Sequence, residues 1–93
     1  MITVYHNSNF TDYYFREVDE LPADLLTKVA EVDSNDLEKA FELTNHIEHN
    51  WTENEEVTPL ISNPRSTSCG DIMEIDGTTL MVISRGFKEV KII

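Results

Sequence analysis

The feature that most constrains this chain is an Asp-Gly pair, Asp76-Gly77, set between two short β-rich runs. The runs cover residues 72–75 (Ile-Met-Glu-Ile) and 79–83 (Thr-Leu-Met-Val-Ile). Two-residue hairpin turns need positive φ angles, which Asp and Gly tolerate, so this arrangement is a strong local signal of a β-hairpin. The sequence therefore predicts an antiparallel pair of strands at this place.

Three further segments, residues 2–5, 25–32 and 87–93, are typical of strands. The first two are rich in β-branched and apolar residues, and the third alternates between apolar and polar positions. Residues 21–24 (Leu-Pro-Ala-Asp) are predicted to be a loop, because proline disfavours helix for the residue before it. Residues 50–64 are polar and contain two prolines, and they are predicted to be a long loop with room for one turn of structure.

One helix is predicted over residues 35–48. Asp36 and its neighbours offer N-cap oxygens, and apolar residues recur at intervals of three and four from Leu37 to Ile47. The resulting order is strand, strand, helix, strand, strand, strand. This order predicts a single α+β domain over residues 1–93, with one main helix packed on a small, mostly antiparallel β-sheet.

Aromatic residues stand out in two places. Residues 10–15 hold four of them, which predicts a segment that covers a sheet edge or lines a pocket: Phe10, Tyr13, Tyr14 and Phe15. Trp51 lies in a polar loop, where packing into the core is the favoured interpretation and a role as a contact anchor is the alternative.

The charge of the chain is concentrated in its N-terminal part. The first 56 residues hold 14 acids and three bases, whereas the remainder is balanced, so the whole net charge of −11 belongs to the first part. Such a surface repels nucleic acid and anionic membranes and attracts basic partners. The expected partner is therefore a protein, with a basic one favoured. We expect neither direct binding to nucleic acid nor binding to a membrane.

The same charge permits a different function. Eleven charges at about 1.7 Å per duplex charge correspond to roughly 19 Å of DNA. The chain could on this basis occupy the basic groove of a nucleic-acid enzyme as a DNA mimic. Because the acids are dispersed along the sequence, a solvated surface is the simpler interpretation.

The most motif-like run is Arg-Ser-Thr-Ser-Cys-Gly-Asp at residues 65–71. Hydroxyl and carboxylate side chains in such loops bond to nearby backbone amides, so a turn that sets the register of the next strand is as good an explanation as a ligand site. Cys69 could act as a nucleophile, but no nucleophile elbow surrounds it and a buried apolar role is preferred. As the only cysteine, it excludes an intrachain disulfide and fits a reducing compartment. With no apolar run of about 20 residues and no leader-like start, a cytoplasmic protein is expected.

Two histidines raise the question of a metal site. On a continuing helix, Glu42, His46 and His49 could share a face and bind a divalent metal, with His6 or Glu53 as a further ligand. The favoured interpretation is that the histidines are solvated near the end of the helix, where cations suit the dipole. We therefore expect no metal and no cofactor, and keep the set of Glu42, His46 and His49 as the alternative.

The layout of the C-terminal half resembles a known family. A helix with an asparagine is followed by a loop, a Ser-x-Ser-x-x-Asp-hydrophobic run, a strand and a Gly-Phe pair. It resembles the YodL-like domain found in polyvalent proteins of mobile elements, and the matching positions are Asn45, Ser66, Ser68, Asp71, Ile72, Gly86 and Phe87. Cys69-Gly70 departs from the more usual pair. The resemblance implies a non-enzymatic accessory domain of phages or mobile elements, with antirestriction as one such role, and it transfers no catalytic residue.

The sequence therefore predicts a protein-interaction domain without enzymatic activity. Its expected contact surface is the acidic helix face, carrying Glu38, Lys39, Glu42 and Glu48, together with the loop from residue 50 to 71. The candidate interaction residues are Asn45, Trp51, Arg65, Ser66, Ser68 and Asp71. A homodimer that pairs through the apolar end at residues 90–93 stays open.

Overall fold

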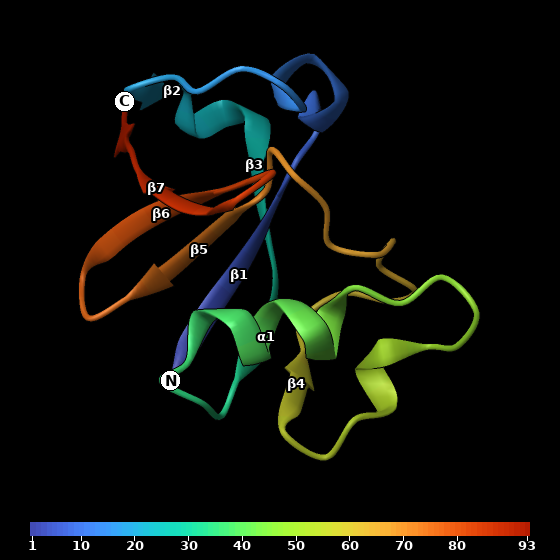
Figure 1. The fold of residues 1–93 in the computed structure, drawn as a ribbon. Helices are drawn as coiled ribbons and strands as arrows, with labels where there is room; N and C mark the ends of the chain where they lie inside the picture. Colours follow the sequence, from blue (N-terminus) through green and yellow to red (C-terminus); the bar gives the residue numbers. More distant parts are fainter.

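The computed structural model describes all of residues 1–93, coloured along the sequence in Figure 1. It contains one α-helix, eight strands and three short 3₁₀ helices (η). In chain order these are β1 (Ile2–Asn7), η1 (Phe10–Tyr13), β2 (Glu20–Leu21), η2 (Ala23–Leu25), β3 (Leu26–Val32), α1 (Leu37–Thr44), η3 (Trp51–Glu53), β4 (Val57–Pro59), β5 (Ile72–Ile75), β6 (Thr78–Ile83), β7 (Gly86–Glu89) and β8 (Lys91–Ile92).

The strands form two sheets. Six of them make an antiparallel sheet in the order β4-β3-β1-β5-β6-β7, and β2 pairs with β8 in a small parallel sheet. The predicted α+β fold, with one main helix on a mostly antiparallel sheet, is confirmed. In Figure 1, α1 and the chain that follows it lie toward one end of the long β1 strand, and β2 and the C-terminus lie toward the other.

Apolar side chains form a core on each face of the large sheet. The core on the helix side contains Ile2, Val4, Val29, Ala30, Val32, Ala40, Trp51, Val57, Met73 and Val82. The core on the other side contains Leu21, Ile72, Met81 and Val90. Neighbours such as Ile72 and Met73 fall in opposite cores because successive side chains of a strand point to opposite faces. Both faces of the sheet are therefore covered.

An irregularity in β3 supports the larger core. The register between β1 and β3 shifts after Val4, which faces Ala30, whereas Tyr5 faces Lys28. Val29 is the extra residue of this bulge, and both Val29 and Ala30 are buried in the helix-side core. The bulge thus lets two consecutive residues contribute to one core.

The predicted hairpin at the Asp-Gly pair is confirmed. β5 and β6 pair antiparallel and end on Ile75 opposite Thr78. Asp76 has a φ of 50° and Gly77 a φ of 81°, which are the positive values that a two-residue turn of type I′ requires.

The helix is shorter than predicted, because it ends at Thr44 instead of residue 48. Asp36 caps its start as expected, accepting two backbone N–H groups with its side chain. At its end, the carbonyl of Thr44 accepts the backbone N–H of Thr67, so a distant segment replaces the next helical turn. His46, Glu48 and His49 consequently lie beyond the helix. None of the helices is long and apolar enough to cross a membrane.

Three other predictions about elements were wrong. The predicted loop at 50–64 contains the edge strand β4, besides η3, which is the one turn of structure that the prediction allowed; the predicted loop at 21–24 includes part of β2 and η2. The predicted final strand is broken at Val90, whose N–H donates to the carbonyl of Thr79 while its own carbonyl accepts the Thr79 hydroxyl. The chain then turns away to pair with β2 as β8.

Candidate functional site

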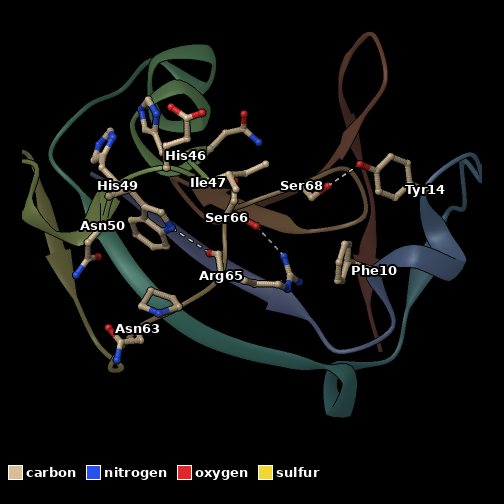
Figure 2. A pocket seen from close by; sticks show the side chains of 14 residues that line it. Phe10, Tyr14, His46, Ile47, His49, Asn50, Asn63, Arg65, Ser66 and Ser68 are labelled. Atoms are coloured by element: carbon tan, nitrogen blue, oxygen red, sulfur yellow. Dashed lines mark hydrogen bonds between the residues drawn. The ribbon is translucent and has the colours of Figure 1, made fainter.

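The candidate interaction residues meet at an open hollow of about 690 Å³ beyond the end of α1. Three segments enclose it (Figure 2): the chain that follows α1, the region of η1, and residues 63–68. We call residues 63–68 the strap. It is lined by Phe10, Tyr14, Asn45, His46, Ile47, Glu48, His49, Asn50, Trp51, Asn63, Pro64, Arg65, Ser66 and Ser68. Of the six predicted interaction residues, all but Asp71 therefore line one hollow.

Arg65 and Asp71 hold the strap in place. The two Nη atoms of Arg65 lie 2.7 Å from the two carboxylate oxygens of Asp71, in a bidentate ion pair. The guanidinium also donates to the carbonyls of Ser66 and Asn7, and it stacks on Phe10 with its Cζ 3.7 Å from the ring centre. These contacts occupy both Nη atoms of Arg65, so the guanidinium acts as a structural centre in the floor of the hollow.

Asp71 lies beneath this floor and is fully buried. Besides Arg65, its carboxylate accepts the backbone N–H groups of Asn7 and Ser68, each at 2.8 Å. Both oxygens thus have two donors each, which satisfies a buried carboxylate. The interpretation of the motif-like run as a self-satisfied turn that precedes a strand fits this geometry.

Thr67 fixes the C-terminal end of the strap. Its hydroxyl lies 2.9 Å from Nε2 of His6, and its backbone N–H donates to the carbonyl of Thr44. The side-chain amide of Asn45 donates to the carbonyl of Thr67 at 2.6 Å. Asn45, a predicted interaction residue, therefore joins the end of α1 to the strap.

Trp51 supports the strap from below. Its side chain is 1% exposed, so the favoured prediction of core packing is confirmed. The indole N–H donates to the carbonyl of Arg65 at 3.0 Å, a bond drawn as a dashed line in Figure 2. A tryptophan N–H that is buried usually finds such a partner.

His6 is a buried titratable group next to this network. The pKa of His6 is lowered from its ordinary 6.5 to about 4, mainly because the ring is buried; the charge of Asp71 acts to raise this pKa and the charge of Arg65 acts to lower it. The imidazole is thus neutral near pH 7. It packs edge-on against Trp51, with the ring centres 6.2 Å apart.

A glycine is required at position 70, two residues after the strap, where the chain passes close to Phe10 of η1. Its φ is +93°, and a Cβ at this position would lie 2.6 Å from the carbonyl oxygen of Phe10. Real Cβ atoms essentially never approach backbone so closely. The glycine of the Cys69-Gly70 pair thus has a local steric reason.

The two serine hydroxyls of the strap and the thiol of Cys69 beside it are not bonded to a base, whereas the Thr67 hydroxyl lies against the neutral His6 imidazole, where both groups are buried. Ser68 Oγ donates to the hydroxyl of Tyr14 at 3.2 Å, and Ser66 Oγ donates to the carbonyl of Thr67. Cys69 is half-buried, and burial raises the pKa of its thiol, which disfavours the reactive thiolate.

His46 and His49 lie together at the rim of the hollow, with their ring centres 4.2 Å apart (Figure 2). Glu42 remains on α1, whereas the histidines follow the helix. No group of three or more His, Cys, Asp and Glu side chains is placed to hold a metal ion.

Sequence reasoning missed the exposure of Ile47, an apolar residue that lines the hollow and is 92% exposed. Phe15 is 89% exposed and is not part of the lining, but its ring centre lies 5.5 Å from that of Tyr14, which is. The spacing of Ile47 predicts a place on the buried face of a longer helix, whereas α1 ends before it. The aromatic segment was a usable signal, because Phe10 and Tyr14 do line a pocket.

No family model, no curated protein and no solved structure matches this chain. The resemblance to the YodL-like domain therefore stays a prediction.

Proposed function

We propose that this protein is a non-enzymatic, acidic protein-interaction domain that binds its partner over the hollow and its apolar rim. The observation that carries the proposal is the exposure of Ile47 and Phe15, at 92% and 89%. Ile47 lines the hollow, and Phe15 lies beside Tyr14, which also lines it. Exposed apolar patches with polar residues around them mark interaction surfaces in soluble proteins.

The energetics favour a contact at this rim. Covering a side chain such as Ile47 or Phe15 is worth about 1.5–3 kcal/mol each. Tyr14, which is 39% exposed, adds an aromatic face whose hydroxyl is already bonded to Ser68. Tyrosine in this setting offers contact area at a small cost in side-chain entropy.

The floor of the hollow is preorganised by hydrogen bonds of the strap. Arg65, Thr67 and Trp51 tie the strap to three other segments through bonds of 2.7–3.0 Å. A surface that is ordered before the partner arrives loses less conformational entropy on binding.

The charge of the protein indicates the kind of partner. Of its 18 acids, only Asp19, Glu56 and Asp71 lie within ion-pair distance of a base. The other carboxylates are free to attract a basic protein over a distance, which raises its rate of association. A basic partner with an apolar contact patch fits both features.

The polar groups of the hollow support a binding role over a catalytic one. Ser66 and Ser68 donate to a carbonyl and to Tyr14, and neither is bonded to a base. A nucleophilic serine needs a base within hydrogen-bond reach.

Comparative affinity capture tests the proposal. The protein and a variant with Ile47→Ser and Phe15→Ser serve as baits in the same lysate, at low and at high salt. Ile93→Ser is the matched control, because Ile93 is 59% exposed and lies at the C-terminus, outside the lining of the hollow. We expect a partner that the wild type and Ile93→Ser retain and that the double variant loses at least tenfold.

A DNA mimic is the second candidate, and the many carboxylates outside ion pairs favour it. It predicts a nucleic-acid enzyme that is released at high salt, because exposed charges are screened. Such binding would be insensitive to Ile47→Ser and Phe15→Ser. Equal capture by the double variant and the wild type would therefore contradict the proposed surface and favour mimicry.

A further inference from the structure

A second surface lies on the helix side of the sheet, between α1 and the turn that joins β6 to β7. It is an apolar groove of about 380 Å³, lined by Glu38, Phe41, Glu42, Cys69, Val82, Ile83, Ser84, Gly86 and Phe87. Of the residues that line the first hollow, none lines this groove. The two surfaces can therefore be tested separately.

The floor of the groove is part of the packed core. Val82 belongs to the helix-side core, and Phe41, Cys69 and Phe87 pack against that core while staying partly exposed. At Gly86, a Cβ would meet nothing within 4 Å, so that end of the groove is open. A firm apolar floor with an open end suits an apolar side chain from another chain.

Two carboxylates on α1 flank this floor. Glu38 and Glu42 stand one helical turn apart and both are exposed. Like charges at this spacing repel, and Glu42 additionally lies in the last turn, where the helix dipole disfavours an anion. No base relieves them: Lys39 pairs with Glu56, and Arg85, in the turn beside the groove, makes no ion pair. A cation from outside would remove this unfavourable arrangement.

From these features we infer that the groove binds an extended segment of a partner protein in which an apolar side chain is flanked by lysine or arginine. The apolar side chain contacts Phe41, Val82 and Phe87. The basic side chains contact Glu38 and Glu42. The apolar floor defines the site, and the charges select the sequence around the apolar residue.

The chain contains a built-in reporter for this site, because its only cysteine, Cys69, lies in the groove. Its rate of alkylation by iodoacetamide should fall when a ligand covers the floor. Backbone amide shifts in ¹⁵N NMR spectra give a second readout, at Val82 and Phe87. Trp51, the only tryptophan, reports on the first hollow and serves to separate the two surfaces.

The probe is a blocked synthetic peptide with the core Lys-Leu-Lys between glycines. The controls are peptides with Glu-Leu-Glu and Lys-Ser-Lys cores. We expect Lys-Leu-Lys to slow the alkylation of Cys69 and to shift Val82 and Phe87. The affinity should fall at least tenfold for Lys-Ser-Lys, which lacks the apolar side chain, and Glu-Leu-Glu should not bind.

Two double variants with the same change in charge complete the test. Glu38→Gln with Glu42→Gln should weaken binding of Lys-Leu-Lys roughly tenfold. Glu17→Gln with Glu20→Gln, which changes exposed acids outside the groove, should leave it unchanged. Both variants replace two glutamates with the uncharged isostere glutamine, and thermal unfolding checks that they fold.

The inference is overturned by any of three results. Equal affinity for Lys-Leu-Lys and Lys-Ser-Lys would make the contact one of charge alone. An equal loss of affinity for Lys-Leu-Lys in both double variants would show that Glu38 and Glu42 do not contact the peptide and that only the net charge of the protein matters. Shifts at Val82 and Phe87 that depend on protein concentration without peptide would assign the groove to a second copy of this chain.

Discussion

Replacing Asp71 with asparagine should strongly destabilise the protein, because it leaves Arg65 without its anion. Asparagine has nearly the same shape, so the change is confined to charge and hydrogen bonding. Its amide presents a donor where one carboxylate oxygen accepts two donors, so the pattern of four bonds cannot be rebuilt. The ion pair holds the strap to the start of β5, and the side chain of Asp71 is fully buried.

The expected loss is about 3 kcal/mol. Breaking a buried ion pair by changing one partner costs about 3–5 kcal/mol. The lower end applies because the side chain of Arg65 is 33% exposed and regains some hydration. A chain of 93 residues has a total stability of about 5–14 kcal/mol, so the variant loses a large part of it. The melting temperature should fall by about 12–24 °C.

Urea and thermal unfolding, followed by the fluorescence of Trp51 and by circular dichroism, measure this loss. Asp19→Asn is the matched control, because Asp19 pairs with Lys88 at a similar 2.8 Å but its side chain is 95% exposed. The bonded Lys88 lowers the pKa of Asp19, yet solvent screens this pair and the control should unfold close to the wild type.

Equal unfolding midpoints for Asp71→Asn and Asp19→Asn would refute the reasoning, because burial would then make no difference to the pair. A double-mutant cycle with Arg65→Met separates the pair from the other bonds of Asp71. Its coupling energy should be about 1–3 kcal/mol. A coupling near zero would mean that the backbone amides alone hold the carboxylate.

Three further predictions concern the same framework. Because the pKa of His6 is about 4 in the folded protein and ordinarily 6.5, the unfolded chain binds more protons between these values, and stability falls as the pH is lowered through this range. The loss should be about 2 kcal/mol between pH 7 and pH 5 in urea unfolding, and His6→Gln should lack this part of the pH dependence. Gly70→Ala should lower the free energy of unfolding by about 2–5 kcal/mol, since it adds a clash with the carbonyl of Phe10 to the strain of a positive φ. Gly77→Ala has open space around it and should lower the free energy of unfolding by only about 1–2 kcal/mol, as measured by thermal unfolding. Asp36→Ala should cost about 1 kcal/mol in the same assay, because two amides in the first turn of α1 lose their acceptor, and no loss would contradict the cap.

The parts of the fold that could be predicted from the sequence are those whose signal is local. The turn at Asp76-Gly77 needs residues that accept positive φ, and no distant contact is required to see this. The cap at Asp36 is equally local. The parts that could not be predicted depend on distant partners: β2 has two residues and exists because β8 lies beside it. β4 contains a proline, which argues against a central strand, and it forms at the sheet edge next to β3.

The end of the helix shows the same dependence. The apolar spacing from Leu37 to Ile47 continues beyond Thr44, so periodicity alone gives no stop signal. The helix ends because of the strap: the backbone N–H of Thr67 donates to the carbonyl of Thr44, and the side-chain amide of Asn45 donates to the carbonyl of Thr67. Ile47 therefore turns outward, and a residue predicted for the core becomes the most exposed large apolar side chain of the molecule, at 92%.

The candidate site reverses the roles that the sequence suggested. The motif-like residues Arg65 and Asp71 use their polar atoms on each other and on the backbone, so they shape the hollow and have little left for a partner. The residues that we propose as partner contacts lie outside the run at residues 65–71: Ile47 has the spacing of a core residue, and Phe15 belongs to the aromatic segment 10–15. An exposed apolar side chain is informative only when its surroundings are known, since most surfaces contain some. In this small domain, the run at residues 65–71 identifies the bonds that fix the strap, whereas the proposed binding surface follows only from the exposed fractions of the side chains.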